Sequence, residues 1–162
     1  MPFAATHIIL TLVIVDLYRD YISKKKFPTY YVLLGGIAGL LPDIDIPIGW
    51  IYNLLYGTQL DFHGGITHII LFPVIFAALA LIFRKSRSLL LAFSLLSFGW
   101  LLHIGMDCIF TNRLPLWPFS GFACPALLPE PLIFTVFPAI DAFVLVAWLI
   151  HEEWRHKIRD YI

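Results

Sequence analysis

The chain has 162 residues, of which 60% are hydrophobic and only 14% are charged, and its mean hydropathy is +0.84. Water-soluble domains usually carry about 25% charged residues, so this composition excludes an ordinary soluble fold and predicts a membrane protein. The formal net charge of zero gives no reason to expect a nucleic-acid partner. The length predicts one integral-membrane domain over residues 1–162.

Five apolar stretches follow one another along the chain, and each approaches the roughly 20 residues that a helix needs to cross a bilayer. They cover residues 3–21, 29–41, 65–83, 88–108 and 132–151. Pro42 directly follows the second stretch, which predicts that its helix ends there and that Asp43, Ile44 and Asp45 form a turn. The expected fold is therefore all-α, a polytopic transmembrane helix bundle of about five spans.

The basic residues are distributed unequally between the connecting segments. Ten of the 11 follow the first, third or fifth stretch: Arg19, Lys24, Lys25, Lys26, Arg84, Lys85, Arg87, Arg155, Lys157 and Arg159. Only Arg113 falls between the fourth and fifth stretches. Because basic residues favour the cytoplasmic side, we expect the N-terminus outside, the C-terminus in the cytoplasm, and a multi-pass location in the cell (inner or plasma) membrane.

On that topology, histidine or aspartate side chains gather toward the outer side of all five expected spans. They are His7, Asp43, Asp45, Asp61, His63, His68, His103, Asp107 and Asp141. Ionisable groups at membrane depth are costly, and for that reason they are usually paired and functional. Asp16 falls toward the cytoplasmic half of the first stretch and is left out of this set.

The spacing of these residues fits a divalent metal, because imidazole with carboxylate suits zinc, manganese or iron. His103 and Asp107 are four residues apart and share one helical face. The expected metal ligands are His7, Asp43, Asp45, His63, His68, His103 and Asp107, with Asp61, Asp141 and Thr67 as candidates for contacts around them. One or two ions, most simply zinc, would activate water and neutralise a phosphate or carbonyl oxygen.

Two of the ligand candidates, Asp43 and Asp45, are also the catalytic candidates. Asp45 is expected either to bridge ions or to act as the general base that orients the attacking water. A plainer interpretation exists for each residue taken alone. The two aspartates would only cap a turn, Asp61 would be a solvated loop carboxylate, and Asp141 would hold helices together. Their joint placement on one side favours the metal site.

Several short motifs occur in a fixed order along nearly the whole chain. They are Thr6-His7, Leu41-Pro42-Asp43-Ile44-Asp45, His63-Gly64-Gly65-Ile66-Thr67-His68, His103-x-x-x-Asp107 and Leu116-Trp117-Pro118-Phe119. This set resembles the YdjM-like family of membrane-bound metal-dependent hydrolases, also described as LexA-binding, inner-membrane-associated hydrolases. The resemblance implies a metal site related to that of zinc-dependent phospholipase C enzymes.

The sequence departs from the family pattern in its His-x-Gly-x-Thr-His motif. The family usually has arginine after the first histidine and serine after the second, whereas this chain has Gly64 and Ile69. If the family arginine binds phosphate, its loss argues against a phosphoester substrate unless Arg113 takes its place from the next outer loop.

The leading hypothesis is a hydrolase that acts at the outer membrane face on a lipid or lipid-linked substrate, expected to be a phosphoester. The aromatic segment 109–131 either guides the acyl chains of the substrate or simply anchors the protein at the interface. The alternatives are a metal-binding transporter or sensor, and a scaffold that binds a cytoplasmic regulator through its basic loops. Cys108 and Cys124 both fall on the outer side, where they form either a disulfide or two free thiols.

Overall fold

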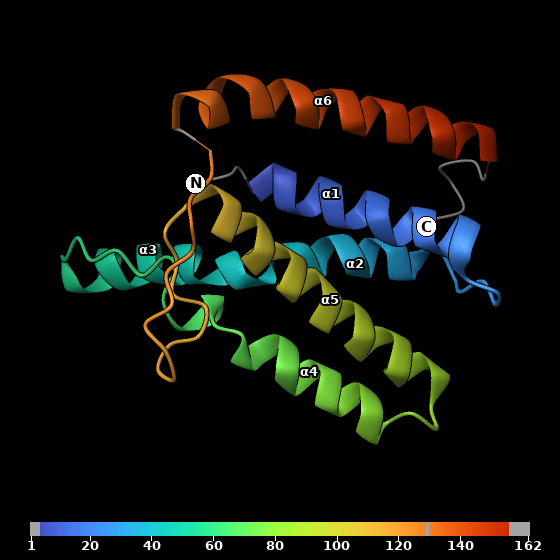
Figure 1. Ribbon diagram of the computed structural model, residues 1–162, viewed down its shortest axis with the longest axis horizontal. Coiled ribbons are helices and arrows are strands. Elements are labelled where there is room, and N and C mark those ends of the chain that lie inside the picture. Colours follow the sequence, from blue (N-terminus) through green and yellow to red (C-terminus); the bar gives the residue numbers. More distant parts are fainter. Residues whose placement is uncertain (1–3, 129, 156–162) are drawn as a thin grey trace.

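The computed structural model describes residues 4–128 and 130–155, and within these ranges it contains helices, turns and loops but no β-strand (Figure 1). The α-helices are α1 (Ala4–Leu17), α2 (Tyr30–Leu40), α3 (Asp45–Tyr56), α4 (Leu71–Ile82), α5 (Arg87–Phe110) and α6 (Glu130–Arg155). One π-helical turn extends α1 (Tyr18–Ile22), and 3-10 turns occupy Leu41–Ile44 and Ile66–His68. The all-α class expected from the sequence is confirmed.

Helix α2 lies at the centre of the bundle, where it packs against α1 on one side and α5 on the other. Helix α4 covers α5, and α6 lies along α1 (Figure 1). Small residues allow these close approaches, as is usual between helices in membranes. Gly39 of α2 lies directly against Thr11 of α1, and Gly99 of α5 lies against Ala38 of α2. The tight α1–α2–α5 contact fixes the relative positions of the side chains at one end of the bundle.

The expected helix end at Pro42 is confirmed, because α2 stops at Leu40 and a 3-10 turn follows, but the span does not end there. The chain passes through one 3-10 turn at Leu41–Ile44 and continues as α3 to Tyr56, so that α2 and α3 run almost in line (Figure 1). Proline is tolerated in the first turn of a helix, where its missing N–H has no helical acceptor. The real end comes at Gly57, whose φ of 62° suits a glycine C-cap. Residues 46–56, which lie between the second and third expected spans, are therefore helical.

The third expected span also differs from the structure. His68 closes a short 3-10 turn, the backbone is extended at Ile69, and α4 begins only at Leu71. The helical segments long and apolar enough to cross a membrane, among the described residues, are Tyr30–Tyr56, Arg87–Phe110 and Phe134–Arg155. Helices α1 and α4 are shorter. The motif at residues 63–68 is consequently a folded segment between helices and not the start of a span.

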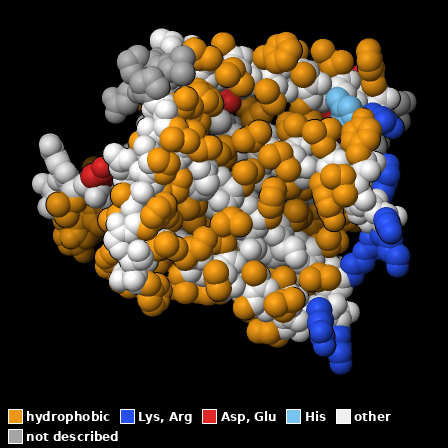
Figure 2. Space-filling view, viewed as in Figure 1, with side chains coloured by type: hydrophobic (Ala, Val, Ile, Leu, Met, Phe, Trp, Pro, Cys, Tyr) orange, Lys and Arg blue, Asp and Glu red, His pale blue; other side chains and the backbone are white. Residues whose placement is uncertain are grey.

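The surface is divided by charge along the bundle axis. Figure 2 shows hydrophobic side chains over most of one face, with lysine and arginine side chains gathered at one end. That end carries the turn after α1 and the α4–α5 connection (Figure 1). Lys157 and Arg159, which contributed to the predicted orientation, lie outside the described residues. The distribution fits the positive-inside rule, and the orientation itself stays a prediction.

Single-cysteine labelling tests this orientation. Both natural cysteines are joined in a disulfide, so that a cysteine introduced for Lys25 or for Phe119 would be the single free thiol. In intact cells, an impermeant thiol reagent is expected to label the protein with Phe119→Cys and to spare the one with Lys25→Cys. The protein with Lys25→Cys should be labelled only after the cells are opened, which shows that its thiol is reactive. Labelling of Lys25→Cys but not of Phe119→Cys in intact cells would show that the orientation is inverted.

Candidate metal centre

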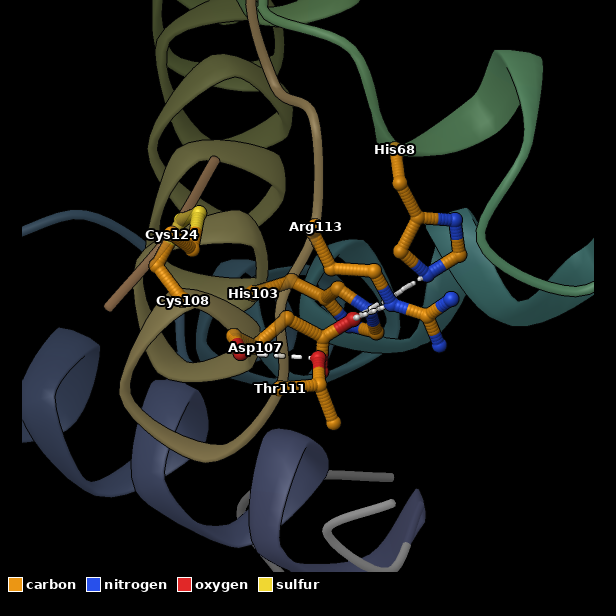
Figure 3. The surroundings of a disulfide bond; sticks show 7 residues. All are labelled: His68, His103, Asp107, Cys108, Thr111, Arg113 and Cys124. Atoms are coloured by element: carbon orange, nitrogen blue, oxygen red, sulfur yellow. Dashed lines mark hydrogen bonds and ion pairs between the residues drawn. A yellow bond between two sulfur atoms is a disulfide. The ribbon is translucent and has the colours of Figure 1, made fainter. Parts of the chain in front are cut away.

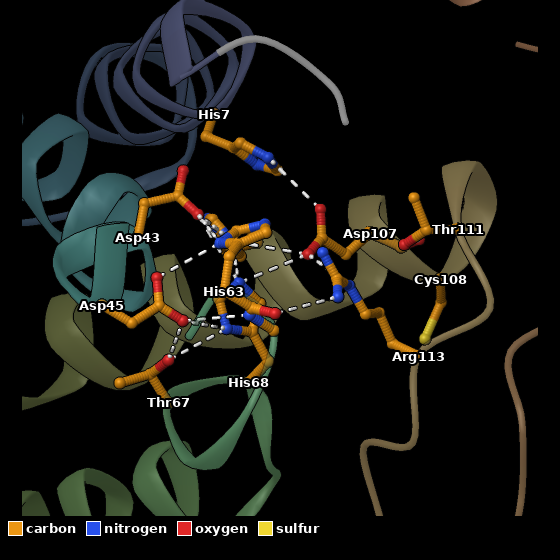
Figure 4. Close-up of polar contacts among 12 residues, drawn as sticks. His7, Asp43, Asp45, His63, Thr67, His68, Asp107, Cys108, Thr111 and Arg113 are labelled. Carbon is orange, nitrogen blue, oxygen red and sulfur yellow. Dashed lines mark hydrogen bonds and ion pairs between the residues drawn. The ribbon is translucent and has the colours of Figure 1, made fainter. Parts of the chain in front are cut away.

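Side chains from distant parts of the chain converge at the end of the bundle opposite the basic residues (Figure 4). They are His7 of α1, Asp43 of the 3-10 turn, Asp45 of α3, His63 and His68 of the segment before α4, and His103 and Asp107 of α5. His7, His68, His103 and Asp107 are each no more than 2% exposed. The structure thus brings together all seven residues expected as ligands.

Two histidines face each other at the centre of this cluster. The Nε2 atoms of His68 and His103 are 3.1 Å apart. His103 Nδ1 lies 2.7 Å from the backbone oxygen of Gly39. Because a carbonyl oxygen only accepts, His103 Nδ1 must carry the proton and its Nε2 presents a lone pair to the centre. A hydrogen bond of this kind typically orients a metal-binding histidine.

Two carboxylates flank this pair of nitrogens. Asp43 Oδ1 lies 3.5 Å from His68 Nε2 and 3.4 Å from His103 Nε2. Asp107 Oδ2 lies 3.4 Å from His68 Nε2 and 3.7 Å from His103 Nε2. The ligand atoms of a tetrahedral zinc ion, with bonds of about 2.0–2.1 Å, are about 3.3 Å apart. Each carboxylate is therefore spaced from the two imidazole nitrogens as ligands of one such ion would be.

Unpaired buried atoms support the same interpretation. Neither Asp107 Oδ2 nor His7 Nδ1 has a hydrogen-bond partner among the described residues. The His7 ring stacks on His103 with 3.8 Å between centroids, and its Nε2 lies 3.5 Å from Asp107 Oδ1. Leaving a buried carboxylate oxygen unsatisfied is costly. His68 Nε2 and Arg113 Nε lie 3.4 Å and 3.7 Å from Asp107 Oδ2 without a hydrogen bond to it, and a divalent ion would supply the missing direct partner, so the residues present fit such an ion.

Asp45 lies at the edge of the cluster formed by Thr67, His63 and His68, where several groups are within hydrogen-bonding reach of its carboxylate. It accepts hydrogen bonds from Thr67 Oγ1 at 2.7 Å and from the backbone N–H of Gly64 at 3.0 Å. His63 Nδ1 lies 3.2 Å from its Oδ1, and His68 Nδ1 lies 3.4 Å from its Oδ2. Asp45, His63 and His68 form one of three overlapping groups that could each hold an ion.

The electrostatic environment of His68, which lies between α3 and α4, favours positive charge. Burial lowers the pKa of its imidazole, but hydrogen bonds with Asp43 and Asp45 and the charge of Asp107 outweigh burial and raise it to about 9. Carboxylates close to an imidazole stabilise its protonated form. In the absence of a metal this proton supplies the compensating positive charge, and a divalent cation would replace it.

The segment 63–68 is held in place from two directions. Trp100 Nε1 of α5 donates to the backbone oxygen of Thr67 at 2.8 Å, and the N–H of Ile70 donates to the backbone oxygen of Pro115 at 2.8 Å. These hydrogen bonds explain how a segment outside the α-helices holds His63 and His68 in a fixed orientation.

Arg113 reaches the centre from the loop that follows α5. Its Nε lies 3.7 Å from Asp107 Oδ2, and its Nη1 donates to the backbone oxygen of His63 at 3.4 Å. A side chain at Gly64 would collide with this guanidinium, and the φ of 79° at Gly64 also favours glycine. Arg113, from the loop after α5, thus lies beside Gly64, the position at which the family usually has arginine.

A disulfide holds the base of this loop (Figure 3). Cys108, at the end of α5, is bonded to Cys124, and the N–H of Cys124 donates to the backbone oxygen of Arg113 at 2.9 Å. Of the two states left open by the sequence, the structure contains the disulfide. The disulfide ties the loop segment at Cys124, which is hydrogen-bonded to Arg113, to α5, the helix that carries Asp107.

Of the three residues expected to contact the ligands, Thr67 lies in the cluster, whereas Asp61 and Asp141 lie outside it. Thr67 lies in the cluster through its bond to Asp45. Asp61 is exposed, and its Oδ1 accepts a hydrogen bond from the N–H of His63 at 2.9 Å, so it stabilises the turn. Asp141 accepts a 2.6 Å hydrogen bond from Thr6 and belongs to none of the groups that could hold an ion. For the last two, the plainer interpretation fits.

A second buried group, which the sequence pattern did not lead us to expect, lies at the other end of the bundle. Asp16 and Glu152 are both fully buried. His151 Nδ1 lies 3.1 Å from Glu152 Oε1 and 3.8 Å from Asp16 Oδ2, and Trp148 Nε1 donates to Asp16 at 3.0 Å. An aspartate inside an apolar stretch was the available signal, because such a group needs a partner on a neighbouring helix.

Comparison with known proteins assigns the chain to a family. The family model described as YdjM inner membrane protein matches residues 1–159. The chain belongs to the YdjM inner membrane protein family. No curated protein and no solved structure matches it. Membership in this family, together with the three helices that are able to cross a membrane, makes the chain a multi-pass inner-membrane protein.

Thr67→Val tests how this family member holds its candidate ligands. The substitution keeps the volume but removes the hydroxyl that donates to Asp45. Loss of a hydrogen bond to such a supporting group typically costs about 10–100-fold in metal affinity. We expect that weakening in a chelator-competition titration. Thr58→Val is the matched control, because the Thr58 hydroxyl bonds Asn53 outside the cluster. Equal affinities of the two variants would contradict this role of Thr67.

Proposed function

We propose that this protein is a membrane-bound metal-dependent hydrolase acting at the outer membrane face on a lipid or lipid-linked phosphoester. The observation that carries the proposal is the meeting of two imidazole Nε2 atoms, 3.1 Å apart, between two buried carboxylates. Asp107 Oδ2 lies 3.4 Å from His68 Nε2 and 3.7 Å from Arg113 Nε, yet it has no hydrogen-bond partner among the described residues. A divalent cation accounts for both features, and zinc fits the mixed nitrogen and oxygen donors best.

In this proposal, His68, His103, Asp43 and Asp107 hold the principal ion. Asp45 and His63 either support it or, together with His68, hold a second one. A bound divalent cation supplies Lewis acidity and lowers the pKa of water. Both oxygens of Asp45 have donors within reach, so we assign it to positioning His63 and His68. Asp43, which contacts His63, His68 and His103, stays the catalytic candidate among the carboxylates.

Arg113 supports a phosphoester in preference to a neutral ester. Its guanidinium is mostly buried beside the ligand cluster, and its Nε has no hydrogen-bond partner among the described residues. Arginine is well suited to bind phosphate through paired N–H donors. A phosphoryl group placed at the ion would therefore meet a second, fixed positive charge on the same side.

Hydrolysis by purified protein tests the proposal. Protein in detergent micelles, supplemented with zinc or manganese, is mixed with phosphatidic acid, phosphatidylglycerol or a polyprenyl diphosphate, and released phosphate or headgroup is measured. We expect at least one substrate to be cleaved, and Asp43→Asn to abolish cleavage. Arg113→Gln should lower the rate by about 10–1000-fold, the range for removal of one stabilising donor. A metal-loaded protein that cleaves no phosphoester would contradict it.

A metal transporter is the second candidate, and the buried group of Asp16, His151 and Glu152 is the observation that favours it. Transport requires polar sites along the path across the membrane, and this group lies at the end opposite the candidate centre. Proteoliposomes loaded with a zinc-sensitive dye distinguish the two functions. Zinc flux that Asp16→Asn abolishes would favour transport, whereas hydrolysis without flux would favour the enzyme.

A further inference from the structure

Two hollows of different chemistry lie beside the candidate centre, along adjoining faces of α3. The first, of about 350 Å³, contains Asp45 and His63 and continues along polar groups of Asn53, Thr58, Gln59 and Asp61. The second, of about 400 Å³, is a groove lined by Ile37, Leu40, Leu41, Ile44, Pro47 and Trp50. Asp43 is the one charged residue in its lining. Ile46 and Trp50 border both hollows, so the two hollows adjoin at these residues.

The groove lies at a depth where hydrocarbon surrounds the protein. Asp43 is thirteen residues beyond Tyr30, the first residue of α2, which corresponds to about 20 Å along a helix. A bilayer core is about 30 Å thick. Ile37 and Ile44 are 56% and 47% exposed along the groove. An apolar groove of this kind, open to the acyl region of the membrane, is filled by hydrocarbon because water gains nothing there.

The polar hollow lies farther along α3, beyond the depth of the groove. Asn53 is about 15 Å from Asp43 along the helix axis, and Gln59 and Asp61 follow the end of α3 at Gly57. Its described lining includes two carboxylates, those of Asp45 and of the exposed Asp61, but no lysine or arginine. The hollow therefore suits an uncharged or cationic polar group, and it disfavours a second anion.

We propose that the substrate is an amphiphile whose hydrocarbon chain lies in the α2–α3 groove and whose uncharged or cationic headgroup lies in the polar hollow. Its bond to be cleaved then lies where the two hollows adjoin, with Asp43 in the lining of one and Asp45 in that of the other. The lipid enters sideways from the membrane, and Trp50 separates its two ends. This inference rests on the proposed hydrolase function and specifies its substrate class.

Photo-crosslinking in nanodiscs tests the groove. The full chain, loaded with zinc, is reconstituted with a phosphatidylethanolamine that carries a diazirine in one acyl chain, and labelled peptides are mapped by mass spectrometry. We expect residues 37–50 to be labelled at least about threefold more than the lipid-facing positions of α6. Ile44→Trp and Ile37→Trp, which fill the groove from different positions, should each remove this excess. Leu81→Trp on α4, where Leu81 is 70% exposed, is the matched control and should retain it.

The metal content of the same samples distinguishes a failure of the groove proposal from a failure of the hydrolase proposal. The groove proposal would be overturned by uniform labelling along the protein, or by an excess that persists in both tryptophan variants. If the same protein binds zinc, the hydrolase proposal still stands. Protein that binds no zinc would overturn the hydrolase proposal whatever the labelling. Equal excess labelling with a diazirine phosphatidic acid, which has an anionic headgroup, would overturn the assigned headgroup class.

Discussion

Replacing Asp43 or His103 with alanine is expected to weaken metal binding by more than about 100-fold, because each substitution removes a ligand and not merely a supporting contact. Asp43 Oδ1 lies within 3.6 Å of ring nitrogens of three histidines, and the Nε2 of His103 faces that of His68. Protein purified from cells should lose its stoichiometric metal in either variant. Inductively coupled plasma mass spectrometry on detergent-purified protein measures the change.

Conservative variants and a distant carboxylate control this experiment. Asp43→Asn and His103→Gln keep the side-chain size and should still insert into the membrane, so that metal loss in them cannot be attributed to misfolding. Asp61→Ala removes an exposed carboxylate near the site and should retain the metal. Asp16→Asn, in the other buried group, should also retain it. Wild-type protein without stoichiometric metal after gentle extraction and supplementation would show that the cluster is a structural network instead.

The arrangement of the ligands could be predicted because membrane burial restricts ionisable groups so strongly. His103 and Asp107 share a helical face by spacing alone, and the structure places both at the centre. Asp43 and Asp107 could be expected to lie close to His68, because the same side of the expected topology has no lysine to compensate the two negative charges. Charge compensation is a physical constraint that can be evaluated from sequence once a topology is assumed.

The path of the backbone around the site could not be predicted in the same way. Pro42 correctly indicates the end of α2, but nothing local shows that the chain continues as α3 after a single 3-10 turn. The close approach of Gly39 to α1, and the use of its carbonyl by His103, depend on the packing of α1, α2 and α5. The partnership of Asp16 with Glu152 depends on the contact of α1 with α6. Tertiary contacts of this kind leave no local pattern in the sequence.

Gly39 connects the packing of the bundle to the geometry of the centre. A Cβ atom at this position would collide with Thr11 Oγ1 and with the backbone oxygen of His7. The carbonyl of Gly39 also accepts the hydrogen bond that orients His103. A larger residue must therefore separate α1 from α2, which displaces His7 and disturbs the acceptor of His103 together.

Gly39→Val is accordingly expected to lower both stability and metal affinity. Overpacking a tight contact costs about 1–3 kcal/mol, which for a chain of this size lowers the melting temperature by about 2–12 °C. Metal affinity should fall by at least about tenfold, because two candidate ligands shift with the helices. Thermal denaturation and chelator competition in detergent measure the two effects. Gly105→Val is the matched control: Gly105 lies on α5, a Cβ atom added there would meet no other atom within 4 Å, and the substitution should change neither quantity. If Gly39→Val binds metal as tightly as Gly105→Val, the centre does not depend on the α1–α2 contact.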